Sequence, residues 1–235
     1  MSYGYDYSVA AHATSSDRAV FIRRTYAHLA GAILAFMGLE ALLLNVVGPE
    51  QVFGVLGASR FSWLIVLLAF MAAGWVARAW AHSDSSPALQ YLGLGLYVVV
   101  EAVIFLPLLY LATRLTDPKV IPTAAIMTLA VFGGLTLAAF VTRKDYSFLG
   151  PILSVSAWVA LGVIVAACLF GFSLGMLFSF AMVALASGYI LYDTSNVMWH
   201  YRTDQHVGAA LELFASVALL FWYILRIVIT TSSRD

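Results

Sequence analysis

Seven long apolar segments recur along this chain, separated by short polar breaks, and each is long enough to cross a lipid bilayer. A membrane-spanning helix needs about 20 apolar residues. Lipid offers the backbone no hydrogen-bond partners, so these segments must be helical, and they are too continuously apolar for barrel strands. The predicted spans are Tyr26–Val47, Phe61–Ala81, Ala88–Ala112, Ile121–Thr142, Phe148–Phe170, Leu174–Met198 and Val207–Thr230.

The shortage of charged residues requires the same environment. Only 10% of the residues are charged and 63% are hydrophobic, whereas about a quarter of a soluble domain is charged. The surface must therefore face the lipid bilayer. The formal net charge is zero, so nothing indicates a nucleic-acid partner. We predict an all-α membrane protein with a flexible polar N-terminal tail, residues 1–20, followed by one seven-helix transmembrane domain, residues 21–235.

Lysine and arginine in the short loops predict the orientation, because the cytoplasmic side of a membrane protein carries more of them. With the N-terminus inside, seven lie on the cytoplasmic side and four on the other. This predicts a cytoplasmic N-terminus and an external C-terminus. The seventh span contains Glu212 and Arg226, so six spans with a re-entrant tail is an alternative. The seven are Arg18, Arg23, Arg24, Arg78, Arg143, Lys144 and Arg202, and the four are Arg60, Arg114, Lys119 and Arg234.

Four carboxyl groups lie inside the predicted spans, where a charge is costly and is by default a functional hypothesis. Glu40 and Glu101 fall near the bilayer midplane. Asp193 lies near the cytoplasmic end of the sixth span, and Glu212 lies at a similar depth in the seventh. Glu40 and Glu101 can instead be protonated carboxyls bonded to neighbouring helices, and Asp193 and Glu212 can instead reach interfacial water without any functional role.

Asp193 and Glu212 flank a short loop, so they are expected to face each other. Two carboxylates in a low dielectric resist joint ionisation, so the pair would bind a proton or a cation. The pair is therefore predicted to sense pH or to hold a divalent cation loosely. Arg78 lies at the right depth to pair with Asp193, or it can extend to the interface as an anchor.

A polar stripe on the last predicted helix places that helix at the centre of the bundle. Glu212, Ser216, Tyr223 and Arg226 fall within about 80° of one another at 100° per residue. Such a stripe must face protein or water rather than lipid.

The sequence does not indicate an enzyme. Gly171–Gly175 fits the G-x-S-x-G pattern of serine hydrolases, but all five histidines fall at the opposite side of the membrane. A catalytic triad cannot assemble across a bilayer. There is no H-E-x-x-H motif for an intramembrane zinc site, and Cys168 is the only cysteine.

Four segments together resemble the Bax inhibitor-1 (transmembrane Bax inhibitor motif) family, in its bacterial form. Phe21–Tyr26 is similar to the family's entry to the first helix, and Glu101–Pro107 is similar to its E-G-x-x-x-x-P segment. Thr142–Gly150 resembles the T-K-x-D-F-S-F-L-G loop, and Ser187–Thr194 resembles the G-Y-I-L-Y-D-T segment. Their order and spacing extend the resemblance from residue 21 to about residue 229.

The resemblance implies a seven-helix bundle with the last helix central and, for some members, a slow, pH-controlled Ca²⁺ leak. In those members the sensor is an aspartate pair on the sixth and seventh helices, with an arginine of the second helix as a latch. Asp193 matches the first aspartate and Arg78 the latch. Ser216 stands at the second aspartate and Leu219 at a following asparagine. Glu212, one turn earlier, is the substitute that remains. The resemblance thus implies a weak, transient Ca²⁺ site at Asp193 and Glu212, and no other cofactor.

The departure at Ser216 keeps a second function open. Bacterial members that lack this aspartate are associated with restraining a membrane-bound AAA protease. The alternative is therefore a non-transporting regulator in the bacterial inner membrane, with the polar N-terminal tail as a handle for a protease or another membrane partner.

Overall fold

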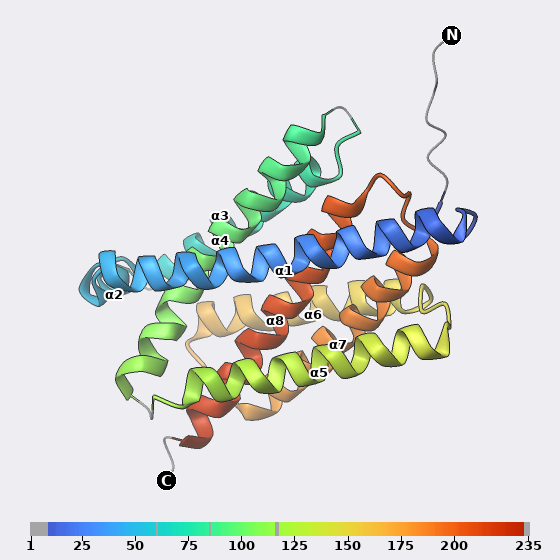
Figure 1. Ribbon diagram of the computed structural model, residues 1–235. Helices are drawn as coiled ribbons and strands as arrows, with labels where there is room; N and C mark the ends of the chain where they lie inside the picture. The colour runs from blue at the N-terminus through green and yellow to red at the C-terminus, as the bar shows by residue number, and fades with distance from the viewer. Residues whose placement is uncertain (1–8, 60, 85, 116–117, 233–235) are drawn as a thin grey trace.

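The computed structural model describes residues 9–59, 61–84, 86–115 and 118–232, and within them the ordered elements are eight helices. Figure 1 shows these helices packed into an elongated bundle. The helices are α1 (Ser15–Val46), α2 (Pro49–Gly57), α3 (Ser62–Ala81), α4 (Pro87–Leu115), α5 (Val120–Thr142), α6 (Leu149–Phe170), α7 (Met176–Trp199) and α8 (His206–Ser232).

The seven predicted spans are confirmed, since α1 and α3 to α8 are each long and apolar enough to cross a membrane. The six-span alternative is wrong, because α8 runs unbroken for 27 residues. The short helix α2 was not expected. It begins at Pro49, and proline is well suited to the first turn of a helix, where its missing N–H has no intrahelical partner.

The first helix begins at Ser15, well before the expected start at Tyr26. Thr14 caps it by accepting a hydrogen bond from the amide of Asp17, whose charge also suits a helix N-terminus. Because this first part of the helix is polar, a hydropathy argument does not detect it. The helix therefore takes up part of the predicted tail.

Part of the predicted tail also contacts the bundle. Residues 1–8 lie outside the described residues, but the Ala10 side chain is fully buried and its amide donates to the Tyr201 carbonyl over 2.8 Å. Val9 forms an antiparallel bridge with Arg202. Arg18 donates to the carbonyls of Ala10 and Ala11. These bonds attach residues 9–11 to the loop between α7 and α8.

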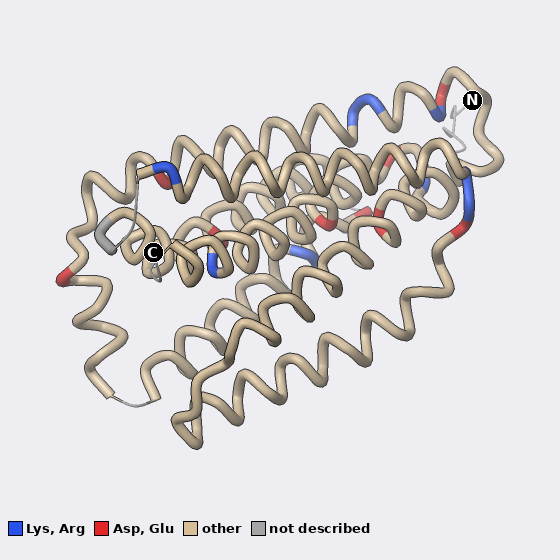
Figure 2. Tube along the Cα trace, turned by 90° about the horizontal axis from the view of Figure 1, so that it is seen from below, with Lys and Arg blue, Asp and Glu red and all other residues tan. Residues whose placement is uncertain are grey.

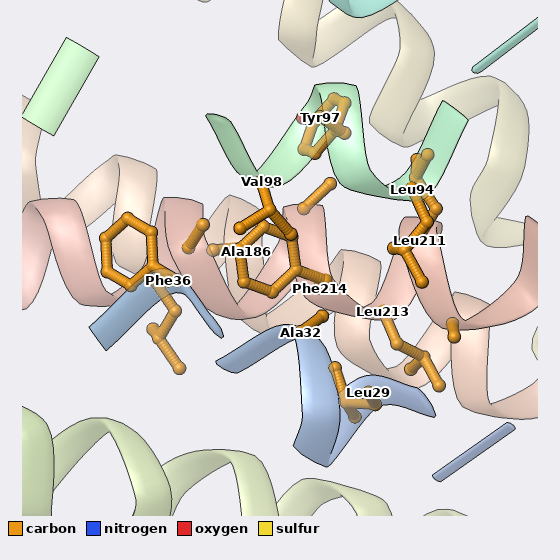
Figure 3. Close-up of a cluster of buried hydrophobic side chains, with 14 of the residues drawn as sticks. Leu29, Ala32, Phe36, Leu94, Tyr97, Val98, Ala186, Leu211, Leu213 and Phe214 are labelled. Carbon is orange, nitrogen blue, oxygen red and sulfur yellow. The ribbon is translucent and has the colours of Figure 1, made fainter. Parts of the chain in front are cut away.

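The last helix lies at the centre of the bundle, as predicted. It contacts α1, α3, α4, α5 and α7, and α6 packs on α7 and α3. In the core the Phe214 ring of α8 packs near Phe36 of α1 and Tyr97 of α4, which are drawn in Figure 3. The ring centres lie 6.0 Å and 6.2 Å from that of Phe214, respectively. Ala186 of α7 fills the same layer.

Helices α3 and α4 pack with their backbones almost in contact. A side-chain carbon at Gly93 of α4 would lie 2.5 Å from the Ala77 carbonyl oxygen and 2.5 Å from the Ala81 amide nitrogen of α3. Small residues permit such close approach in membrane proteins, where packing rather than water drives helix association. In the same helix pair, Arg78 of α3 donates to the Tyr97 hydroxyl of α4.

The loop between α5 and α6 is attached to the end of α7 through Asp145. Its carboxylate accepts from the Ser147 amide over 2.8 Å and lies 3.0 Å from the His200 ring. Ser195 of α7 donates to the same carboxylate and accepts from the Tyr146 amide. The Ser147 amide and the His200 ring lower the pKa of Asp145 below its usual range. The loop that resembles the family's T-K-x-D-F-S-F-L-G segment thus follows α5 and is bonded to the end of α7.

Charged residues are sparse along the chain, as Figure 2 shows, and a small group lies within the bundle. Helix α1 begins and helix α8 ends at opposite ends of the bundle. Ion pairs gather at the end where α1 begins, because Arg202 contacts both Asp84, before α4, and Asp204. Arg60 and Arg234, which the orientation argument counts on the other side, lie outside the described residues.

Replacing Gly93 should destabilise the fold. Gly93→Ala forces α3 and α4 apart, and we expect a loss of about 1–3 kcal/mol, as for other overpacked sites. Gly95→Ala is the matched control, because a side-chain carbon there meets nothing within 4 Å. Thermal unfolding in detergent compares them. Equal melting temperatures for the two variants would show that this close approach contributes nothing.

The Asp145 contacts should stabilise the protein only while the carboxyl is ionised. Because the folded state lowers the pKa, the contribution is present above the ordinary pKa and disappears as the pH falls through the lowered value. The group is half exposed, so Asp145→Asn should cost no more than about 1 kcal/mol at neutral pH. Unfolding is measured at neutral and at acidic pH, with the exposed Glu50→Gln as control. A loss of stability in Asp145→Asn that persisted in acid would contradict this prediction.

Candidate functional site

A cavity of about 770 Å³ lies inside the bundle beside α8. Its walls come from α3, α4, α6, α7 and α8. Tyr201 and Asn196 line it towards the end where α1 begins, and Leu174 and Arg226 line it towards the opposite end. The cavity therefore follows α8 along much of its length.

The polar stripe of α8 lines this cavity. Glu212, Ser216, Tyr223 and Arg226 all contribute to the wall. Arg226 donates to the Leu174 carbonyl, so the guanidinium group is bound to the loop between α6 and α7. The structure thus places all four residues towards protein and cavity rather than lipid, as their spacing predicts.

Arg78 forms an ion pair with Glu212. Its Nε lies 3.2 Å from Oε1 and 3.1 Å from Oε2, and its Nη2 donates to the Tyr97 hydroxyl over 3.3 Å. The guanidinium carbon lies 5.0 Å from the centre of the Tyr97 ring, a cation–π distance. The expected pairing of Arg78 with Asp193 is wrong. The guanidinium group contacts Glu212 of α8, which lies one helical turn before Ser216, the residue that binds Asp193. The Arg78 side chain is 43% exposed, so its role as an interfacial anchor stays a prediction.

Asp193 is bonded instead to the residue that replaces the family's second aspartate. The Ser216 hydroxyl donates to Asp193 Oδ2 over 2.5 Å, a length typical of strong bonds to a carboxylate. Asp193 is 6% exposed and Ser216 is 5% exposed. Asp193 and Glu212 therefore line one cavity, but each has its own partner. That the two titrate as a pair stays a prediction.

The two predicted midplane carboxyls lie in different surroundings. Glu101 lines the cavity together with Tyr97, whose hydroxyl accepts a hydrogen bond from Arg78. Glu40 is buried but is absent from the cavity wall, and neither of its carboxyl oxygens has a hydrogen-bond partner in the described part of the chain. Only Glu101 therefore belongs to the candidate site.

Apart from Tyr223, the sequence argument missed the tyrosines of the cavity. Tyr189 and Asn196 lie four residues before and three residues after Asp193, so helical spacing puts all three on one face of α7. That spacing was a usable signal. Tyr201 had no such signal, because it lies in a loop.

Tyr201 lies where the cavity approaches the α7–α8 loop. Its ring stacks on that of His82, with 6.3 Å between the ring centres. Burial, together with the negative charges of Glu212 and Asp193, raises the pKa of Tyr201 above its usual value. The hydroxyl therefore stays neutral, and the bulky ring covers this part of the cavity wall.

Comparisons with known proteins place the chain in a family. The family profile described as "Inhibitor of apoptosis-promoting Bax1" matches residues 18–234. Protein LIFEGUARD 4 of Arabidopsis thaliana is 29% identical over 88% of this chain and 83% of its own length. An uncharacterized protein of Neisseria meningitidis is 26% identical over 98% of both chains, and one of Pseudomonas aeruginosa is 29% identical over 88% of this chain and 87% of its own length. The chain therefore belongs to the Bax inhibitor-1 family of multi-pass membrane proteins.

Proposed function

We propose that the protein is a pH-sensitive Ca²⁺ leak channel of the bacterial inner membrane, with its N-terminus in the cytoplasm. One observation carries the proposal: the cavity beside α8 is lined by Asp193, Glu212 and Glu101. Ionisable groups at membrane depth mark ion pathways in many membrane proteins. Carboxylates in a low-dielectric cavity attract cations, as acidic rings do in cation channels.

Ca²⁺ is the transported ion here rather than a resident cofactor. A bound Ca²⁺ takes 6–8 oxygen ligands. Asp193, Ser216 and Glu212 offer oxygen ligands, but Glu212 is occupied by Arg78 and Asp193 by Ser216. Weak and interrupted coordination suits passage, because a conducting site must release the ion that it binds.

The Arg78–Glu212 ion pair is the closed state of the proposed channel. While this ion pair is intact, the guanidinium cation of Arg78 occupies the place of the conducted ion, and Glu212 cannot bind that ion. Protonation of Glu212 removes the charge that holds Arg78. Arg78 lies in the last turn of α3, so its released side chain can extend to the aqueous interface. The leak should therefore increase as the pH falls.

Ca²⁺ flux into proteoliposomes tests this proposal between about pH 8 and about pH 5, a range that extends towards the ordinary pKa of a glutamate carboxyl. Glu212→Gln imitates the protonated carboxyl, so its flux should be high throughout and nearly independent of pH. We expect an increase of about tenfold at pH 8, since a hydrogen bond to a charged group contributes about 1.5–3 kcal/mol. Asp193→Asn should reduce the flux.

Glu40→Gln is the control for these variants, because it removes a buried carboxyl that does not line the cavity. Its flux should follow that of the unmodified protein at each pH. Flux no greater than that of empty liposomes across the whole range would reject the channel.

The Ser216–Asp193 bond favours a second candidate, a non-transporting regulator that restrains a membrane-bound AAA protease. The serine hydroxyl satisfies Asp193 inside the bundle, so the cavity can be purely structural. In this case the purified protein conducts no Ca²⁺, binds a purified AAA protease in mixed vesicles and slows the degradation of a membrane substrate. Unchanged proteolysis at saturating concentration would contradict the regulator.

A further inference from the structure

A second hollow, of about 540 Å³, lies between α1 and α4, away from the proposed ion pathway. Its wall is almost entirely apolar. Gly31 and Ala35 of α1 and Gly95 and Val99 of α4 are exposed along it. A side-chain carbon at Gly31 or at Gly95 would meet nothing within 4 Å. The two helices therefore leave an open groove towards the surrounding membrane.

The length of the groove matches one leaflet. On α1 it extends from Ala27 to Leu39, which is about 18 Å at 1.5 Å per residue. Half of the hydrocarbon core is about 15 Å. A partner transmembrane helix would need a contact across the full bilayer, whereas an acyl chain needs only one leaflet. The dimensions therefore favour lipid.

Polar and cationic groups gather at one end of the groove. His28 and Tyr91 line this end, with the His28 Nε2 3.1 Å from the Tyr91 hydroxyl. The His28 Nδ1 donates to the Arg24 carbonyl over 2.7 Å, and its ring centre lies 4.9 Å from that of His206 at the start of α8. Arg24 and His28 both interact electrostatically with His206.

Arg24 is the cation available at this end. It is exposed, and no carboxylate of the described chain pairs with it. Asp204, the acid that interacts with His206, is already bound to Arg202 at 2.6 Å. At 100° per residue, Arg24 lies within about 20° of the centre of the groove face of α1, whereas Arg23 lies about 120° away.

We infer that this groove binds an anionic phospholipid from the leaflet at the end where α1 begins. One acyl chain lies along Gly31 and Gly95, and the phosphate contacts Arg24 beside His206 and Tyr91. Arginine suits the phosphate because its guanidinium group donates two parallel hydrogen bonds. A headgroup with an added amine offers no net negative charge, so the site should prefer phosphatidylglycerol to phosphatidylethanolamine. Tyrosine is also common at the headgroup level.

Native mass spectrometry of the full chain, titrated with each lipid in detergent, tests the inference. Phosphatidylglycerol should bind more tightly than phosphatidylethanolamine. Arg24→Gln should weaken phosphatidylglycerol binding about fivefold, since one basic residue near an anionic surface contributes about that much. Arg23→Gln, with the same charge change one residue away, should leave binding unchanged.

A second pair of variants tests the groove itself. Gly31→Leu fills it and should also weaken binding, whereas Gly162→Leu, at an exposed and equally open glycine of α6, should not. Glycerol phosphate, which lacks acyl chains, should not displace the lipid. Equal losses in Arg24→Gln and Arg23→Gln, no effect of Gly31→Leu, or displacement by glycerol phosphate would each overturn the inference. All readouts are independent of ion flux.

Discussion

The free-energy cost of placing a charge in hydrocarbon governs this structure. Helix α8 carries Glu212 near one end and Arg226 near the other, and neither can face lipid without a penalty of several kcal/mol. The bundle removes that penalty by enclosing the helix, so that α1, α3, α4, α5 and α7 supply its neighbours. The centrality of α8 therefore follows from its polar stripe.

Enclosure alone does not satisfy these charges, and the partners that do so shape the cavity. Glu212 is bonded to Arg78, Asp193 to Ser216, and Arg226 to the Leu174 carbonyl. Each bond joins α8 to a different segment. Arg78 of α3 also donates to the Tyr97 hydroxyl of α4, and these two helices approach closely at Gly93. An outer helix thus supplies the cation that pairs with the central one.

The sequence was sufficient for what depends on local hydrophobicity and helical periodicity. The seven spans and the face of α8 followed from these alone. The polar start of α1 and the short helix α2 did not, because neither has the apolar composition of a span. The partner of Arg78 was also missed. Choosing between Asp193 and Glu212 depends on how α3 is rotated and shifted against α7 and α8, and one turn of about 5.4 Å decides it.

The central claim is that the cavity beside α8 holds water and opens in acid. Thiol labelling tests this directly in a Cys168→Ala background, which carries no other cysteine. Ala215→Cys and Ala218→Cys place a thiol on the cavity wall, and Ala210→Cys places one on a buried face outside it. A charged, membrane-impermeant reagent should label the first two and leave the third unlabelled. Because only the thiolate reacts, each rate is divided by that of a free thiol at the same pH, and this ratio should rise for the first two as the pH falls. Equal resistance of all three at every pH would contradict the account.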